Sequence, residues 1–186
     1  MNESQREDLL AFARAVIEAR LTGTNAPPDP RIELPSRKCS GAFVTLHNQG
    51  RLRGCIGRFA NNVDVVQTIR EMAVAALGDP RFAHEPVTAS ELPEIDLEIS
   101  VLSPMQRTKD PLSLELGVHG ILIQRGGRSG CFLPQVAPEQ QWTKEQFLSY
   151  CCSHKAGLSP DAWNDPATEV YLFSAEVFGE REHGNG

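Results

Sequence analysis

The stretch from Gly41 to Gly57 constrains the fold of this chain more than any other. Apolar and polar residues alternate on both sides of Asn48-Gln49-Gly50. A loop of that composition, with Gly50 free to take a left-handed conformation, is typical of a turn between antiparallel strands. The stretch therefore predicts a β-hairpin. A three-residue loop would set three cross-strand pairs: His47 with Arg51, Thr45 with Arg53, and Phe43 with Cys55.

This register sorts the side chains of the predicted hairpin onto two faces. The apolar face, which we expect to join the core, carries Ala42, Val44, Leu46, Leu52 and Ile56. The mixed face carries Phe43, Thr45, His47, Arg51, Arg53 and Cys55. Because residues two apart on a strand point the same way, Arg53 and Cys55 are expected to share a face whatever the length of the loop.

Hydrophobic periodicity predicts the other elements. Helices are expected over residues 4–21, 62–77 and 143–155, with these caps: Ser4 paired with Glu7, Asn61 or Asn62, and Thr143. Strands are expected over residues 95–101, 120–124, 130–133 and 170–178. Interspersed elements with two hairpins predict an α+β fold, in which helices flank a mostly antiparallel or mixed sheet. We expect one domain over residues 1–180 and a flexible tail over residues 181–186.

Composition narrows the function classes. The chain has 186 residues and a formal net charge of −6, so the phosphate attraction of nucleic-acid-binding proteins is not expected. A small basic patch at Arg51, Arg53 and Arg58 is the one argument for such binding. No apolar run is long enough to span a membrane, and five cysteines without an even framework suit a reducing compartment. These features predict a cytoplasmic protein that binds neither nucleic acid nor membrane.

Reactive chemistry concentrates in Leu52-Arg53-Gly54-Cys55-Ile56-Gly57. A thiol becomes a useful nucleophile when its thiolate is stabilised, and a neighbouring arginine can do that. We therefore expect Cys55 and Arg53 to be catalytic, the alternative being that Cys55 is a half-buried structural residue. The two glycines would let a ligand approach the backbone. The candidate binding residues here are Gly54, Gly57, Phe43 and Arg51.

Other candidate sites are weaker. Cys151, Cys152 and His154 are near neighbours, but a zinc site needs ligands that converge, and no C-x-x-C spacing is present. We expect no metal and no cofactor. Three scattered histidines could act as general base for the thiol if the fold brings one near: His47, His84 and His119.

The hexapeptide resembles the signature of the AMMECR1 family, and further segments resemble that family along roughly the whole chain. They are Asp79-Pro80-Arg81-Phe82, Glu91-Leu92-Pro93, Glu98-Ile99-Ser100-Val101-Leu102, Gly117-Val118-His119-Gly120-Ile121, and Leu133-Pro134-Gln135-Val136-Ala137 with Trp142. Arg81 and His119 lie in these segments and join the candidate binding residues.

The resemblance implies an α+β fold with a larger sheet-and-helix part and a smaller helical subdomain, and it puts the signature in a cleft. The family's biochemical role is undefined. Bacterial and archaeal members resemble the first component of a three-part system with a Memo-like protein and a radical-SAM protein. The Memo-like proteins resemble extradiol dioxygenases, so the resemblance favours an enzyme over a scaffold.

The sequence leaves three hypotheses open. In the first, the protein is an enzyme in which Cys55 is a nucleophile or redox thiol, while Arg53 stabilises the thiolate and holds a small anionic substrate. In the second, Arg53, Cys55 and Phe43 form a non-catalytic ligand- or protein-binding face that acts with a Memo-like or radical-SAM partner. The third, nucleic-acid binding, rests on three arginines and is disfavoured by the acidic net charge.

Overall fold

The structure, a computed structural model, describes residues 1–181. The chain divides into two compact units, one of Met1–Leu102 with the residues from Glu176 onward, the other of Ser103–Ala175. Both units combine helices with antiparallel strands, so the predicted α+β fold is confirmed. Of the tail predicted over residues 181–186, residues 182–186 lie outside the described part.

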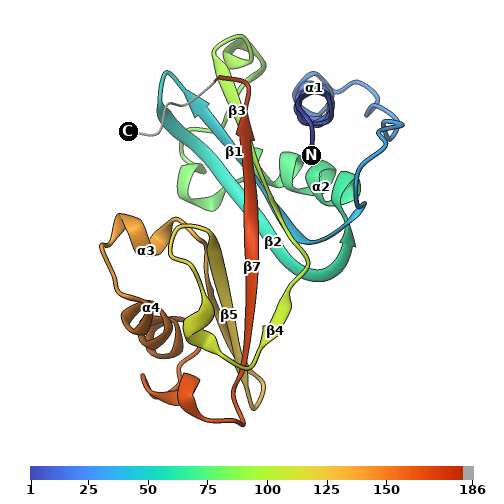
Figure 1. The fold of residues 1–186 in the computed structure, drawn as a ribbon. Coiled ribbons are helices and arrows are strands. Elements are labelled where there is room, and N and C mark those ends of the chain that lie inside the picture. Colours follow the sequence, from blue (N-terminus) through green and yellow to red (C-terminus); the bar gives the residue numbers. More distant parts are fainter. Residues whose placement is uncertain (182–186) are drawn as a thin grey trace. The chain divides into compact units, whose positions relative to one another are not determined.

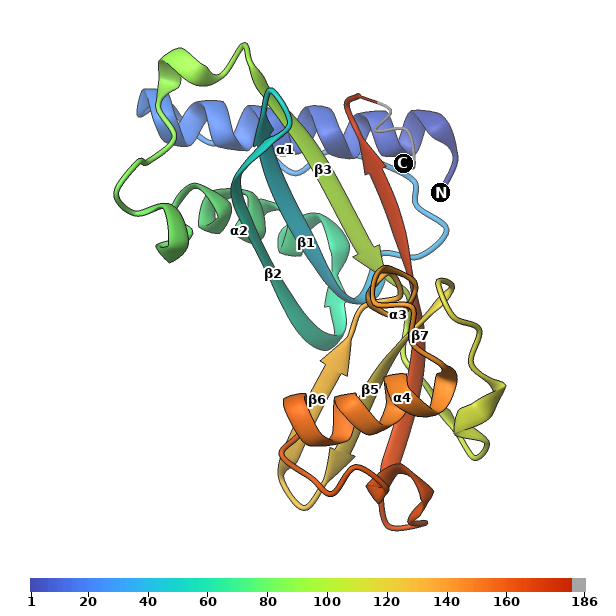
Figure 2. The same cartoon turned by 90° about the vertical axis from the view of Figure 1, so that its left-hand side faces the viewer.

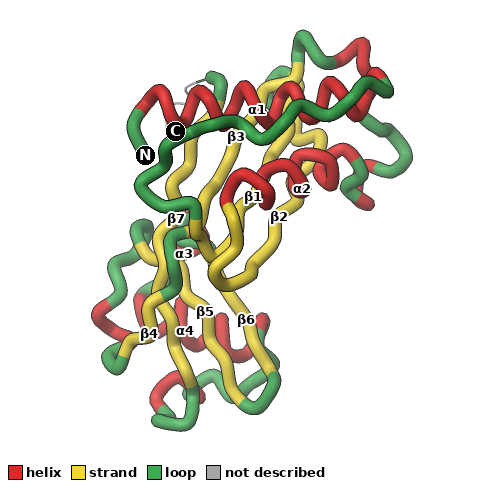
Figure 3. Tube along the Cα trace, turned by 90° about the vertical axis from the view of Figure 1, so that its right-hand side faces the viewer, coloured by secondary structure: helices red, strands yellow, loops and turns green. Residues whose placement is uncertain are grey.

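An antiparallel ladder in the order β2-β1-β3 runs through the first unit. Its strands are β1 (Lys38–Asn48), β2 (Arg51–Asp64) and β3 (Ile95–Leu102). Helices α1 (Glu3–Thr22) and α2 (Val65–Leu77) cover one face of these strands, as two opposite views show (Figures 2 and 3). The core between them includes the buried side chains of Leu9, Ala13, Ala42, Val44, Leu46, Ile69, Ala73, Leu97 and Ile99.

Helix α1 begins with a different cap from the predicted one. Asn2 is the N-cap: its side chain accepts a hydrogen bond from the Gln5 amide, and the Gln5 side chain accepts one from the Asn2 amide, both at 2.9 Å. The prediction of Ser4 with Glu7 is wrong because this capping box, two residues earlier, already satisfies the free amides of the first turn. The apolar side of α1 packs into the core, where Leu9, Leu10, Ala13, Val16 and Ile17 are buried.

The predicted hairpin is present, but its turn and register differ. The turn has two residues, Gln49 and Gly50, whose φ angles of 50° and 80° are those of a type I′ turn. A β-bulge then shifts the register, and Arg53 is the extra residue on β2. The three predicted pairs are therefore wrong. The observed pairs include Asn48 with Arg51, Thr45 with Cys55, and Phe43 with Gly57.

Strand β2 is longer than predicted, and α2 begins later. β2 keeps pairing with β1 as far as Asp64. The Asp64 carboxylate then caps α2 by accepting hydrogen bonds from the amides of Val66 and Gln67 at 3.0 and 3.1 Å. The predicted cap at Asn61 or Asn62 is wrong because both residues belong to β2, and the helix begins only after Asp64.

Two short 3₁₀ turns follow α2 before β3 begins. They are η1 (Pro80–Phe82) and η2 (Ala89–Glu91). Asp79 precedes η1 and its side chain accepts the Arg81 amide, which fixes the first turn. This connecting segment supplies most of the polar groups that meet β2.

The second unit packs helices against its own strands. The strands are β4 (Gln106–Thr108), β5 (His119–Arg125), β6 (Arg128–Phe132) and β7 (Glu169–Gly179), the last as far as Ala175. β5 pairs with β6 and β7, and β4 pairs with β7. Helices α3 (Val136–Glu139) and α4 (Lys144–Tyr150) follow β6 in the chain (Figure 1). The smaller unit thus carries strands as well as helices.

The predicted third helix changes character halfway. Its predicted cap is confirmed, because the Thr143 hydroxyl accepts the Gln146 amide at 3.3 Å. After α4 the chain continues as a π-helical turn over Cys151–Lys155. Cys151 and Cys152 are both fully buried there.

Candidate functional site

The two glycines of the hexapeptide serve close packing. A Cβ on Gly54 would lie 2.2 Å from the Ala76 carbonyl oxygen at the end of α2. A Cβ on Gly57 would lie 2.0 Å from Cδ1 of Phe43, whose ring also meets Phe59 edge-on at 5.3 Å. The chain itself fills the space beside both glycines, so their predicted contact with a ligand gives way to a structural role, and Phe43 shares it.

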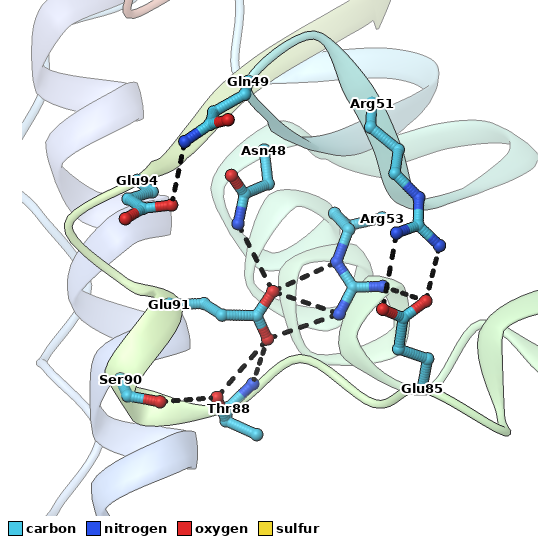
Figure 4. Close-up of polar contacts among 9 residues, drawn as sticks. All are labelled: Asn48, Gln49, Arg51, Arg53, Glu85, Thr88, Ser90, Glu91 and Glu94. Carbon is cyan, nitrogen blue, oxygen red and sulfur yellow. Dashed lines mark hydrogen bonds and ion pairs between the residues drawn. The ribbon is translucent and has the colours of Figure 1, made fainter.

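Arg53 lies inside a polar network (Figure 4). Its side chain is 3% exposed. Nε and Nη2 donate to Oε1 and Oε2 of Glu91 at 3.2 and 3.3 Å, and Nη1 lies 3.5 Å from Oε2 of Glu85. Two carboxylates therefore balance its charge, and this enclosed guanidinium is not placed to receive the anionic substrate that the sequence suggested for it.

The same network joins the hairpin to the segment between α2 and β3. Glu91 also accepts the Thr88 amide at 3.0 Å, and the exposed Arg51 pairs with Glu85. Burial raises the pKa of Glu91, but the Thr88 amide and the Arg53 charge outweigh it and leave that pKa below its ordinary value. The contacts of Arg51 and Arg53 therefore serve to anchor the hairpin.

Cys55 meets different groups from Arg53. Its thiol is partly exposed and accepts a hydrogen bond from the Thr45 hydroxyl at 3.2 Å, across the β1–β2 pair. Its backbone N–H donates to Oδ2 of Asp79 at 3.0 Å, and its carbonyl accepts from Nη2 of Arg81 at 3.1 Å. Because β2 ends the strand order, these two side chains satisfy backbone groups that a further strand would otherwise pair.

Asp79 and Arg81 form a tight pair beside Cys55. The Asp79 side chain is 1% exposed and accepts from the Nε and Nη2 groups of Arg81 at 3.1 and 2.6 Å. Arg81 holds the pKa of that carboxyl well below its ordinary range. Asp79 in the first place, and Cys55 after it, raise the pKa of Arg81. The Arg81 side chain stays 58% exposed, so it is a cation that meets both Cys55 and solvent.

His119, the last of the candidate binding residues, belongs to the second unit. It begins β5, and its Nδ1 accepts the Glu115 amide at 2.9 Å, which closes the turn before the strand. This bond gives His119 a local structural role in that unit.

The other four cysteines have thiols with raised pKa values. Cys39, Cys151 and Cys152 are buried, and Cys131 is partly buried. Burial raises the pKa of all four thiols, that of Cys131 to about 11. Within residues 1–181, no group of His, Cys, Asp and Glu side chains could hold a metal ion. No helix in the same range is long and apolar enough to cross a membrane.

Sequence reasoning missed Asp79 and Thr45 and did not connect Arg81 with Cys55. A signal for Asp79 existed, because an aspartate directly before a proline often caps the turn that follows. No spacing in the sequence indicates that this cap also reaches a strand 24 residues earlier. Thr45 was placed on the correct face but given the wrong partner.

Comparisons with known proteins agree with this fold. The model of the family described as AMMECR1 matches residues 10–178. A protein of Methanothermobacter thermautotrophicus is 41% identical over 189 residues, covering 97% of this chain and 96% of its own. One of Methanopyrus kandleri is 40% identical over 188 residues, covering 95% and 88%. The crystal structure of an uncharacterised protein of Pyrococcus horikoshii superposes with a TM-score of 0.77 at 35% identity, covering 97% and 94%.

Proposed function

The chain belongs to the AMMECR1 family, and from that premise we propose that it is an enzyme in which Cys55 is the reactive thiol and Arg81 binds a small anionic substrate. The observation that carries the proposal is the position of Arg81. Its side chain is more than half exposed, yet its Nη2 donates to the Cys55 carbonyl. An anion held by that cation lies beside a partly exposed thiol.

The contacts of Arg81 leave part of the guanidinium for a ligand. Within residues 1–181, Asp79 and Cys55 engage Nε and Nη2, whereas no hydrogen bond of Nη1 is found and the side chain is 58% exposed. A carboxylate or phosphate accepts hydrogen bonds from such a group with the aid of its charge. This is why Arg81 replaces Arg53 as the proposed anion-binding residue.

Thr45 of β1 contacts the sulfur of Cys55. Its hydroxyl donates to the Cys55 sulfur at 3.2 Å, and a donor strengthens its bond when the acceptor becomes an anion. Thr45 and Arg81 thus meet Cys55 from two sides, one at its sulfur and the other at its carbonyl.

A second candidate function is a binding module without chemistry, in which the same face holds a ligand or a Memo-like or radical-SAM partner. The observation that favours it is the Asp79 carboxylate, which offsets the charge of Arg81 at the thiol. Complex formation that survives Cys55→Ser and is lost in Arg81→Gln would favour this candidate over the enzyme. A cytoplasmic location and the absence of nucleic-acid binding stay predictions.

Two alkylating reagents of nearly equal size test the proposal. The rate of Cys55 modification is measured by peptide mass spectrometry with anionic iodoacetate and with neutral iodoacetamide. Arg81→Gln should lower the iodoacetate rate relative to the iodoacetamide rate about 2- to 5-fold, the size of one partly solvated charge interaction. The matched control is Arg51→Gln. Arg51 is exposed, lies on the same hairpin as Cys55 and pairs with Glu85.

The control should leave the ratio of the two rates unchanged. An equal ratio in the native protein and in Arg81→Gln would show that Arg81 does not draw anions to Cys55. A Cys55 thiol that resists both reagents in the folded protein would rule out a reactive role.

A further inference from the structure

Asp79 is the most enclosed charged group near Cys55, and the proposed function gives it no task. Its side chain is 1% exposed. One oxygen, Oδ2, accepts both the Cys55 amide at 3.0 Å and Nη2 of Arg81 at 2.6 Å. The other, Oδ1, accepts the Arg81 amide and Nε. A single carboxylate thus accepts hydrogen bonds from the backbone of Cys55, from the backbone of Arg81 and from two nitrogens of the Arg81 guanidinium.

These contacts fix the guanidinium from two sides. Nε and Nη2 grip the carboxylate as a fork, and Nη2 also donates to the Cys55 carbonyl at 3.1 Å. An arginine side chain that is 58% exposed would otherwise sample many rotamers. The ring of Asp79, Arg81 and the Cys55 peptide therefore holds the cation beside the sulfur. The conformational entropy of the arginine side chain is lost when the protein folds, and not when a substrate binds.

The charge of Asp79 acts in the opposite direction. A carboxylate this near disfavours a thiolate and repels an anionic substrate. The charged and titratable groups that share the region are few. Arg81 comes from η1, and strand alternation places His47 of β1 and Glu98 of β3 on the face that carries Thr45. Arg53 lies in its own network with Glu85 and Glu91.

We infer that Asp79 is a positioning residue, which holds the Arg81 guanidinium against Cys55 and so gives the site its preference for anions. The inference rests on the proposed function. The direction in which anion binding changes when Asp79 is replaced distinguishes positioning from a simple charge effect. Loss of the carboxylate charge alone would strengthen the attraction of an anion to the thiol, whereas release of Arg81 into solvent would weaken it.

Asp79→Asn separates the two effects, because asparagine keeps an acceptor for the Cys55 amide and loses the charged grip on Arg81. The readout is again the ratio of iodoacetate to iodoacetamide rates at Cys55. Asp79→Asn should lower this ratio about 2- to 5-fold, as Arg81→Gln does. The double variant should fall no further than either single one, because both changes remove the same interaction. An unchanged or increased ratio in Asp79→Asn overturns the inference.

The matched control is Asp64→Asn. Asp64 also caps a helical segment and pairs with an arginine, Arg37, at 2.9 Å, but it lies at the far end of β2. Its loss should reduce stability without changing the ratio. Should Asp79→Asn fail to fold, Arg81→Lys gives the same answer, since lysine keeps the charge and cannot form the fork. A lowered ratio in Arg81→Lys supports positioning, and an unchanged ratio overturns it.

The outcomes separate the inference from its premise. If Arg81→Gln leaves the ratio unchanged, the proposed role of Arg81 is wrong. If Arg81→Gln lowers the ratio and Asp79→Asn does not, the proposed function stands and the role of Asp79 is wrong.

Discussion

Cys55 on β2 and Cys151 at the end of α4 show how one side chain behaves in two surroundings. Cys151 is fully buried in the apolar core of the second unit, where burial raises the pKa of its thiol. Cys55 is partly exposed, with the Thr45 hydroxyl on its sulfur and Arg81 on its carbonyl. The nature of the neighbouring groups, and not the spacing of cysteines in the chain, therefore decides which thiol can react.

The largest expected difference between the two regions is in alkylation rate. In the folded protein at pH 8, iodoacetamide should modify Cys55 at least about 100-fold faster than Cys131 or Cys151, because the raised pKa values of those two thiols leave little thiolate. Peptide mass spectrometry measures the rates. The difference should vanish in 6 M guanidinium chloride, with all sites modified alike (a concentration of about 6 M unfolds most domains). Equal alkylation rates at Cys55 and Cys151 in the folded state would show that their surroundings do not set the reactivity of the two thiols.

Serine substitution should separate the two regions by stability. Cys151→Ser places a hydroxyl in an apolar core and should lower the free energy of unfolding by about 1–3 kcal/mol. Cys55→Ser keeps a partner in Thr45 and should cost less than about 1 kcal/mol. Urea unfolding of the two variants measures both values. A larger loss at Cys55 would indicate that its thiol is a structural element of the hairpin.

The smallest effect concerns acid stability, to which the carboxylate beside Cys55 should contribute. Arg81 depresses the folded pKa of Asp79, so the stabilisation is fully present above the unfolded value of about 3.9 and is lost as pH falls toward the folded pKa. Asp79→Asn should therefore be less stable by about 1–2 kcal/mol at pH 7. Thermal unfolding from pH 7 to pH 2 should show this gap narrowing below about pH 4.

The exposed Asp8 of α1 provides the control. Asp8→Asn should follow the native protein over the same pH range more closely than Asp79→Asn does. A gap between the native protein and Asp79→Asn that stays constant down to pH 2 would show that the depressed pKa has no effect on folding.

The sequence predicted the elements of the fold better than the contacts of the site. Alternation and helical periodicity located α1, β3 and the hairpin because burial of one face imposes a period on the residues themselves. The turn type was missed because Asn48-Gln49-Gly50 suits two loop lengths, and the observed one depends on Gln49 adopting a positive φ. The bulge at Arg53 compensates for that turn and leaves the apolar side chains of β1 in the core.

By itself the sequence determined the α+β class, the hairpin with its buried face, and the position of Cys55 on the same face as Thr45. The tertiary structure alone decided which arginine accompanies that cysteine. Arg53 is two residues from Cys55, yet Glu85 and Glu91 enclose it, whereas Arg81 arrives from 26 residues away on a turn capped by Asp79. The physical reason is that a buried charge needs counter-charges nearby. Distant segments supply them when the chain packs, and the spacing of residues along the chain does not indicate which segments those are.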